Sequence, residues 1–242
     1  MIKIEKTEVV GWEHVIRGMR NPMNSWDQSD SKYVCGDKRC TSMDGCDLCC
    51  EIPYFKVGEK DADLMMRLRN AGTDHRKFMR MIVVYMDITA PLYWWKEFDT
   101  YKVGTVANSC STMHKIQDKE FTFEDFSCEH MTKHSITVLR DIINFLNMHR
   151  TAYISKPDQR VDPYSIVSDE GHTKYKKGIW WQMIQLLPSA YNQKRTVMLN
   201  YEVLTNMYHN RKNHKLDEWH NFCEWIETLP YKELICSEKM NG

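Results

Sequence analysis

The stretch from Ala90 to His114 constrains this chain most, because it joins two segments of opposite character. An Ala-Pro pair at residues 90–91 leads into an aromatic run, Tyr93-Trp94-Trp95. From residue 100 onward the side chains are mostly small and hydroxylated, and neither a helical nor a strand period fits them. Hydroxyls, backbone N–H groups and one Lys suit a loop that wraps a phosphate. The alternative is an ordinary polar loop.

The length of 242 residues allows one large domain or two small ones, and we predict a single domain over residues 1–242. The formal net charge is zero, which gives no electrostatic bias toward a nucleic-acid polymer or a membrane surface. No apolar run approaches the roughly 20 residues of a membrane span. The N-terminus alternates like a strand and does not resemble a signal peptide. We therefore expect a cytoplasmic protein.

Five of the nine cysteines lie in a Cys-rich loop at residues 33–50, with the spacing C-x4-C-x5-C-x2-C-C. Zinc takes four tetrahedral ligands, and a C-x2-C pair supplies two of them from one turn. The candidate ligands are Cys35, Cys40, Cys46 and Cys49, and a zinc ion there would staple the loop. The alternative is a set of partly buried reduced thiols.

Apolar periodicity predicts a chain of mixed helix and strand. Strands are expected at residues 2–10 and 78–88, the second because it is apolar and β-branched. Helices are expected at residues 12–19, 61–70, 135–149 and 216–229. Asp61 is a plausible N-cap for the second helix. The aromatic residues of the last helix indicate the core or a subunit interface.

A further helix is predicted after Leu187-Pro188. Its apolar face would comprise Val197, Tyr201, Leu204, Met207 and Tyr208. Arg211 falls at its C-terminal end, where a solvated cation would complement the helix dipole.

These features resemble the signature of flavin-dependent thymidylate synthases, over roughly residues 60–220. In that family an Ala-Pro leads through an aromatic segment into Arg-His-Arg-x-x-Ser-x-Asn-Glu-x-Ser-x-Arg-Tyr. Laid down without gaps from Ala90, the motif places Arg-His-Arg on Thr100-Tyr101-Lys102, the first Ser on Thr105, Asn-Glu on Ala107-Asn108 and the second Ser on Cys110. A shift of one residue places the Asn on Asn108 and the second Ser on Ser111.

Two flanking anchors carry the resemblance further. His75 stands at the spacing from Ala90 of the family's His, which contacts the flavin; the alternative is a surface or capping role. Asn200 and Arg211 stand at the family's spacing from Leu187-Pro188. In the family, this Asn opens a helix and contacts the flavin, and this Arg ends the helix and contacts the pyrimidine of the nucleotide. The resemblance therefore implies a helix that starts at Asn200.

The resemblance implies a fold of the α/β class (α+β type), with a central, largely antiparallel sheet flanked by helices. It also implies an FAD-dependent methyltransferase that converts dUMP to dTMP with methylenetetrahydrofolate and NADPH, in a homotetramer. The cofactor would carry the hard chemistry. The implied cofactor-binding residues are His75, Tyr101, Lys102 and Asn200. The implied substrate-binding residues are Thr105, Asn108, Ser109, Cys110, Ser111 and Arg211, and Arg211 is also the catalytic candidate because it can stabilise charge on the ring.

The chain lacks most of the cationic residues of the family pattern. Of the Arg-His-Arg triplet only Lys102 keeps a charge, and Lys cannot replace a bidentate guanidinium. Glu202 stands where the family has an Arg two residues after the Asn. Phosphate binding would then depend on Lys96, Arg80 or backbone N–H groups. Alternatives are a relative that modifies another pyrimidine nucleotide, a non-catalytic module that binds a nucleotide or a protein, and chance similarity of an α/β domain.

Overall fold

The computed structural model describes residues 2–35, 54–155 and 169–238, which group into two compact units. Unit 1 contains residues 88–100 and 108–196 together with the first three residues. Unit 2 contains residues 4–87, 101–107 and the chain from residue 197 onward. The expectation of one domain over the whole chain stays a prediction.

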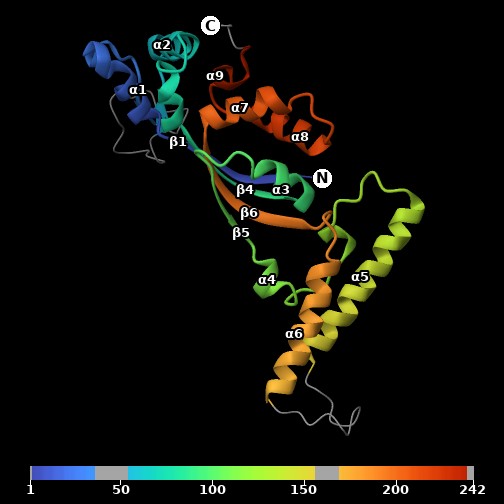
Figure 1. The fold of residues 1–242 in the computed structure, drawn as a ribbon. Helices are drawn as coiled ribbons and strands as arrows, with labels where there is room; N and C mark the ends of the chain where they lie inside the picture. The colour runs from blue at the N-terminus through green and yellow to red at the C-terminus, as the bar shows by residue number, and fades with distance from the viewer. Residues whose placement is uncertain (1, 36–53, 156–168, 239–242) are drawn as a thin grey trace. The chain divides into compact units, whose positions relative to one another are not determined.

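An antiparallel sheet of four strands has the order β1-β4-β6-β5 (Figure 1). These strands are β1 (Lys3–Val10), β4 (Val83–Pro91), β6 (Asn192–Asn200) and β5 (Val106–Ser109). A second sheet pairs β2 (Lys32–Val34) with β3 (Tyr54–Lys56), and Tyr33 lies opposite Phe55. The predicted fold class is confirmed, because an antiparallel sheet is flanked by helices.

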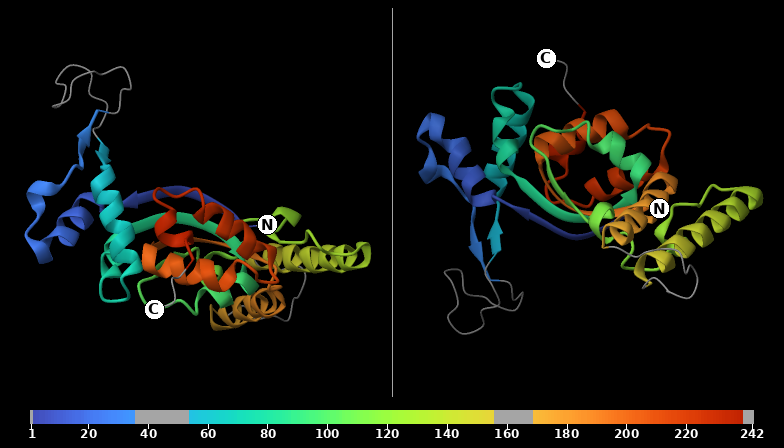
Figure 2. Two further views of the ribbon diagram at one scale, coloured as in Figure 1. Left: turned by 90° about the horizontal axis from the view of Figure 1, so that it is seen from above. Right: turned by 60° about the horizontal axis from the view of Figure 1, so that its bottom comes forward.

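Unit 1 contains a helical hairpin in which α5 (Lys133–Ile154) and α6 (Asp169–Leu186) lie antiparallel and side by side (Figures 1 and 2). The helix predicted at residues 135–149 is confirmed and is longer than expected. Its buried face includes Leu139, Ile143 and Leu146, which form one core cluster with Met183 of α6. The shorter elements of this unit are α3 (Leu92–Phe98), α4 (Thr112–Lys115) and η4 (Phe123–Asp125).

Unit 2 is built around α7 (Tyr201–Arg211), which packs against α8 (Asp217–Ile226), α9 (Glu233–Cys236) and η3 (Arg76–Met81). Its other helices are α1 (Trp12–Arg20), η1 (Asn21–Met23), η2 (Trp26–Gln28) and α2 (Glu59–Asn70). The aromatic side chains Trp219 and Phe222 of α8 are 0% exposed. Of the two interpretations of this helix, the structure therefore supports the core.

Three predicted element assignments are wrong, because the apolar pattern of the sequence does not show where these helices and strands begin and end. The apolar run at residues 78–88 begins as η3, and the strand starts only at Val83. Residues 106–109 form β5 within the stretch expected to be a loop, and every side chain of this strand is exposed, which leaves no alternation to detect. Val197 belongs to β6 and not to the face of the following helix.

Asp61 is not the N-cap of α2, because the helix begins two residues earlier and Gly58 occupies the cap position. The capping oxygens come instead from Asp30, which accepts hydrogen bonds from the backbone nitrogens of Lys60 (2.9 Å) and Asp61 (3.1 Å). The carboxylate of Asp61 is thereby left to make tertiary contacts.

The fully buried carboxylate of Asp61 ties α2 to α1 and to the chain before β2. The guanidinium of Arg20 forms an ion pair with it at 2.6 Å, and the hydroxyls of Ser29 (2.6 Å) and Ser31 (2.5 Å) donate to its second oxygen. Burial alone would raise the pKa of Asp61, but hydrogen bonds from Ser29, Ser31 and Arg20 outweigh burial and lower it below the ordinary 3.8. The carboxylate therefore stays ionised and stabilises the folded state at neutral pH.

We expect Asp61→Ala to lower the free energy of unfolding by about 3–5 kcal/mol, because it leaves the buried guanidinium of Arg20 uncompensated. Urea unfolding measures this loss. Since the folded pKa is lowered, the contribution of Asp61 should be full well above pH 4 and disappear as the pH falls through the folded pKa. Asp63→Ala on the same helix is the control, because this side chain is 68% exposed and should change stability by about 0.5 kcal/mol or less. Equal losses in the two variants would contradict the assignment.

The side chain of Asn200 caps α7, accepting a hydrogen bond from the backbone nitrogen of Val203 at 3.0 Å. Gly104 approaches this cap closely with φ of +76°. A Cβ at residue 104 would lie 2.7 Å from Nδ2 of Asn200, which is closer than packed atoms tolerate. The predicted helix start at Asn200 is confirmed, and Gly104 is what allows the chain to pass over it.

Gly104→Ala should destabilise the fold more than Gly72→Ala, by about 1–3 kcal/mol. Both glycines have positive φ, so both variants carry about the same backbone strain of 1–2 kcal/mol. Only residue 104 adds a collision, since nothing lies within 4 Å of a Cβ at residue 72. Thermal unfolding of the two variants side by side measures the difference. Equal destabilisation would show that Asn200 moves aside at no cost.

Candidate functional site

Arg211, the predicted catalytic residue, lies against two aromatic rings of unit 2 that contact each other. Its Nε donates a hydrogen bond to the hydroxyl of Tyr101 at 3.0 Å. Its guanidinium carbon lies 4.9 Å from the ring centre of Trp219 and 5.6 Å from that of Tyr101. Such cation–π contacts fix the orientation of a guanidinium. Arg211 is therefore a positioned cation and not a freely solvated one at the end of α7.

The segment 101–107 lies alongside α7. Tyr101 contacts Arg211 at the C-terminal end of this helix, and Gly104 lies beside Asn200 at its N-terminal cap. Two predicted cofactor-binding residues, Tyr101 and Asn200, are thus connected to Arg211 through one helix and one loop. Lys102 is exposed on this loop. The hydroxyl of Thr105 is buried and, within the part of the chain that the structure describes, has no hydrogen-bond partner. A buried hydroxyl without a partner is uncommon and is consistent with a missing ligand.

A polar cavity of about 260 Å³ lies beside His75, and we call it the arginine cavity. It is lined by residues of α2, η3, α7 and the turn before η3: Arg69, Thr73, Arg76, Met79, Arg80, Glu202, Thr205 and Asn206. His75 is exposed and directly precedes Arg76. The structure thus places the predicted flavin-contacting His next to a group of cations that sequence reasoning had only partly identified.

The three guanidinium groups of the arginine cavity differ in how they are already used. Arg69 is buried and donates to backbone carbonyls near the C-terminus, those of Leu234 (3.1 Å), Ser237 and Glu238 (3.1 Å). Burial lowers the pKa of Arg69, and the charge of Arg76 lowers it further. Arg69 is therefore mainly structural.

Arg80 makes a two-pronged ion pair with Glu202, with distances of 2.5 Å and 3.2 Å between nitrogen and oxygen. The hydrogen bond to Glu202 raises the pKa of Arg80. Arg80 is thus neutralised by Glu202, and Arg69 is used by backbone carbonyls. Among the described residues, Nε of Arg76 is buried without a hydrogen-bond partner. Of the three guanidinium groups, that of Arg76 is the one that suits an anion such as a phosphate.

The remaining predicted substrate residues, Asn108 to Ser111, lie in unit 1 and are exposed. The backbone of Cys110 is fixed to β6, because its nitrogen donates to the carbonyl of Lys194 at 2.9 Å and its carbonyl accepts from Nε2 of Gln193 at 3.0 Å. The hydroxyl of Ser111 caps α4 by accepting from the nitrogen of His114 at 3.0 Å. These residues present a polar edge whose backbone is held in place.

Arg195 holds the side chain of Gln193, which in turn donates to the backbone carbonyl of Cys110. The sequence did not identify Arg195 as a site residue. Its guanidinium stacks over Trp95 at 4.2 Å and forms an ion pair with Asp99 at 2.7 Å. Its Nε donates to Gln193 at 3.1 Å, and the indole of Trp95 donates to the backbone carbonyl of Gln193 at 2.9 Å. Polar residues at alternate positions 193 and 195 were the available signal, but the strand that carries them was not predicted.

The proposed zinc ligands Cys40, Cys46 and Cys49 lie outside the described residues. In residues 2–35, 54–155 and 169–238, which include Cys35, no group of three or more His, Cys, Asp or Glu side chains could hold a metal ion. Over the same ranges, no helix has the length and apolarity that a membrane span requires. The candidate site is therefore assembled from cations, hydroxyls and aromatic rings.

No family model and no curated protein matches this chain. Solved structures match it over nearly its whole length. Thymidylate synthase X from Helicobacter pylori, with FAD and dUMP, has a TM-score of 0.55 at 13% identity and covers 98% of both chains. A second Helicobacter pylori structure, also with FAD and dUMP, has a TM-score of 0.56 at 14% identity and the same coverage.

A UMP/dUMP methylase, PolB from Streptomyces cacaoi bound with 5-Br dUMP, has a TM-score of 0.53 at 12% identity. It covers 99% of this chain and 95% of its own. The predicted resemblance is therefore confirmed at the level of the fold: the chain has the fold of the flavin-dependent thymidylate synthases.

Proposed function

We propose that this protein binds FAD and a pyrimidine nucleotide and transfers a one-carbon unit to the pyrimidine ring. The observation that carries the proposal is the position of Arg211, which two aromatic rings hold on the helix that Asn200 caps. Residues implied to contact the nucleotide and the flavin thus share one rigid element. The solved structures of this fold that contain FAD and dUMP support the same assignment.

In its specific form the reaction converts dUMP to dTMP, with methylenetetrahydrofolate as the donor and NADPH as the reductant, in a homotetramer. A second candidate is methylation of another pyrimidine nucleotide such as UMP. Two observations favour this second candidate: the likeness to the UMP/dUMP methylase, and the replacement of the family's cations at residues 100 and 202. Assays with both nucleotides separate the two.

The residues present fit FAD. The arginine cavity offers guanidinium groups for a diphosphate, and Nε of Arg76 is buried without a partner among the described residues. His75 and Asn200 flank the segments that line this cavity. When bound, the flavin would supply the reduction and the transfer of the one-carbon unit.

Arg211 has the role of stabilising negative charge that develops on the pyrimidine ring. A guanidinium stays protonated throughout the physiological range, so the positive charge is available without a proton transfer. The hydrogen bond to Tyr101 and the ring of Trp219 orient the charge before the substrate arrives. A preoriented charge is worth more than a mobile one, because no reorganisation is needed in the transition state. The reaction needs no thiol nucleophile, so Cys110 has no covalent role.

Purified protein should retain close to one FAD per chain after desalting, as read from its visible absorbance. Arg76→Gln should weaken the affinity for FAD at least tenfold, because a charge-assisted hydrogen bond to phosphate is lost. Arg67→Gln is the control, since that residue is 69% exposed on α2 and does not line the cavity. A colourless protein that never holds FAD would end the flavin proposal. Equal retention in both variants would remove only Arg76 from it.

Arg211→Ala should lower kcat by about 10²–10³-fold with the fold intact, because the preoriented charge is lost. Arg211→Lys should recover little, since an ammonium cannot donate to Tyr101 and lie against Trp219 in the way that a planar guanidinium does. Turnover with dUMP and with UMP measures the loss, and circular dichroism checks the fold. An unchanged rate in Arg211→Ala would take this residue out of the mechanism.

A further inference from the structure

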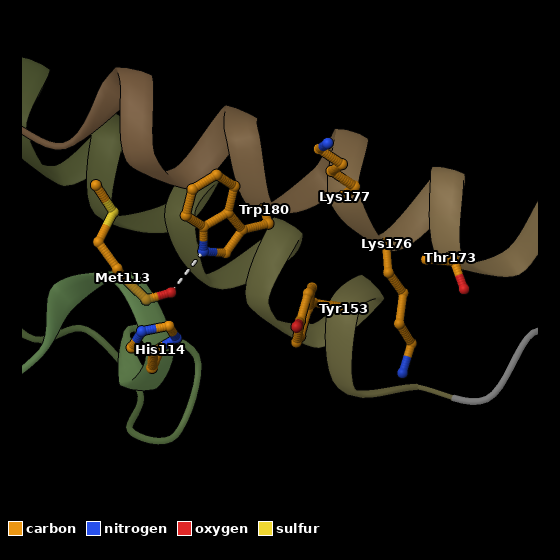
Figure 3. A pocket seen from close by; sticks show the side chains of 7 residues that line it. All are labelled: Met113, His114, Tyr153, Thr173, Lys176, Lys177 and Trp180. Atoms are coloured by element: carbon orange, nitrogen blue, oxygen red, sulfur yellow. Dashed lines mark hydrogen bonds between the residues drawn. The ribbon is translucent and has the colours of Figure 1, made fainter.

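A second and larger cavity, of about 740 Å³, lies in unit 1 between α4, the C-terminal end of α5 and the first half of α6 (Figure 3). We call it the hairpin cavity. Its lining consists of Met113, His114, Tyr153, Thr173, Lys176, Lys177 and Trp180. A volume of this size is ordinary for a small-molecule site.

The lining combines basic side chains with flat aromatic rings. The indole of Trp180 is fixed by a hydrogen bond from Nε1 to the carbonyl of Met113 at 2.9 Å. Nζ of Lys176 lies 5.4 Å from the ring centre of Tyr153. Figure 3 shows His114 below Trp180 at one end of the cavity, and Tyr153 with Lys176 at the other. Among the residues that the structure describes, none that lines the cavity is an Asp or a Glu.

We propose that the hairpin cavity binds a small anion that carries a flat aromatic ring. Lys176 and Lys177 would meet the phosphate or carboxylate, because ammonium groups pair with such anions. Trp180, held in one orientation, would stack on the ring of the ligand. Since Lys176 now rests on the face of Tyr153, an anion competes only with a cation–π contact and not with a carboxylate.

The proposed function supplies two ligands of this chemistry, a pyrimidine nucleotide and a reduced folate, and the choice of probes rests on that function. The cavity begins at Met113 and His114, directly after the segment 108–111 that is expected to bind substrate. The cation that the chain lacks at residue 100 would therefore be supplied from α6.

Fluorescence titration of the full chain tests the proposal, with dUMP and a stable reduced folate as probes and with deoxyuridine and inorganic phosphate as partial ligands. At least one probe should quench the emission to saturation. The quench should vanish in Trp180→Phe and persist in Trp181→Phe, because the neighbouring indole does not line the cavity. Lys176→Gln should weaken binding about tenfold, whereas Lys174→Gln on the same helix should not. Which probe acts identifies the ligand.

Absence of a quench with both probes would overturn the proposal, as would a quench that survives in Trp180→Phe or a Lys176→Gln variant with unchanged affinity. Inorganic phosphate binding as tightly as the probe that quenches would also overturn it, because the rings would then contribute nothing. FAD retention of the same variants separates this inference from the proposed function. A yellow protein without Trp180-dependent binding loses only the inference, and a colourless protein with such binding loses only the flavin chemistry.

Discussion

The junction between β6 and α7 sets the geometry on which unit 2 depends. Asn200 is both the last residue of β6 and the N-cap of α7. The backbone nitrogen of the next residue, Tyr201, donates to the carbonyl of Ile82 at 3.1 Å. The hydroxyl of this buried Tyr reaches the carbonyl of Pro230 at 2.6 Å. With the start of α7 fixed in this way, its 11 residues carry Arg211 about 16 Å along the axis to its place against the rings of Tyr101 and Trp219.

The distribution of positive charge distinguishes this chain from the signature that it resembles. That signature gathers its cations in one loop, whereas here the loop keeps only Lys102. Guanidinium groups line one cavity of unit 2, and two lysines line another cavity in unit 1. In the first, Arg80 is paired with Glu202, a residue 122 positions away in the sequence. The cations of this chain are therefore spread over residues that no single sequence motif contains.

The sequence predicts well what depends on neighbouring residues and poorly what depends on distant ones. The long amphipathic helix α5 is a local feature and was predicted from its apolar period, whereas the start of α7 at Asn200 was expected from the resemblance. The edge strand β5 is exposed on both faces, so it has no period, and it exists only because β6 lies beside it. The arginine cavity joins residues more than a hundred positions apart, as in the pair of Arg80 and Glu202, and no local pattern could reveal it.

The role of the aromatic run that follows Ala90-Pro91 is explained by the contact of Trp95 with Arg195. A Trp directly before a substrate loop suggests a stacking platform for a ligand, but Trp95 is 1% exposed and its faces are occupied. Its ring supports the guanidinium of Arg195, and its indole nitrogen fixes the carbonyl of Gln193, whose side chain holds the carbonyl of Cys110. Trp95 therefore acts on the polar edge at residues 108–111 through Gln193 and Arg195. A buried ring of this kind supports a loop from behind, whereas the indole of Trp180 is fixed in orientation on the wall of a cavity.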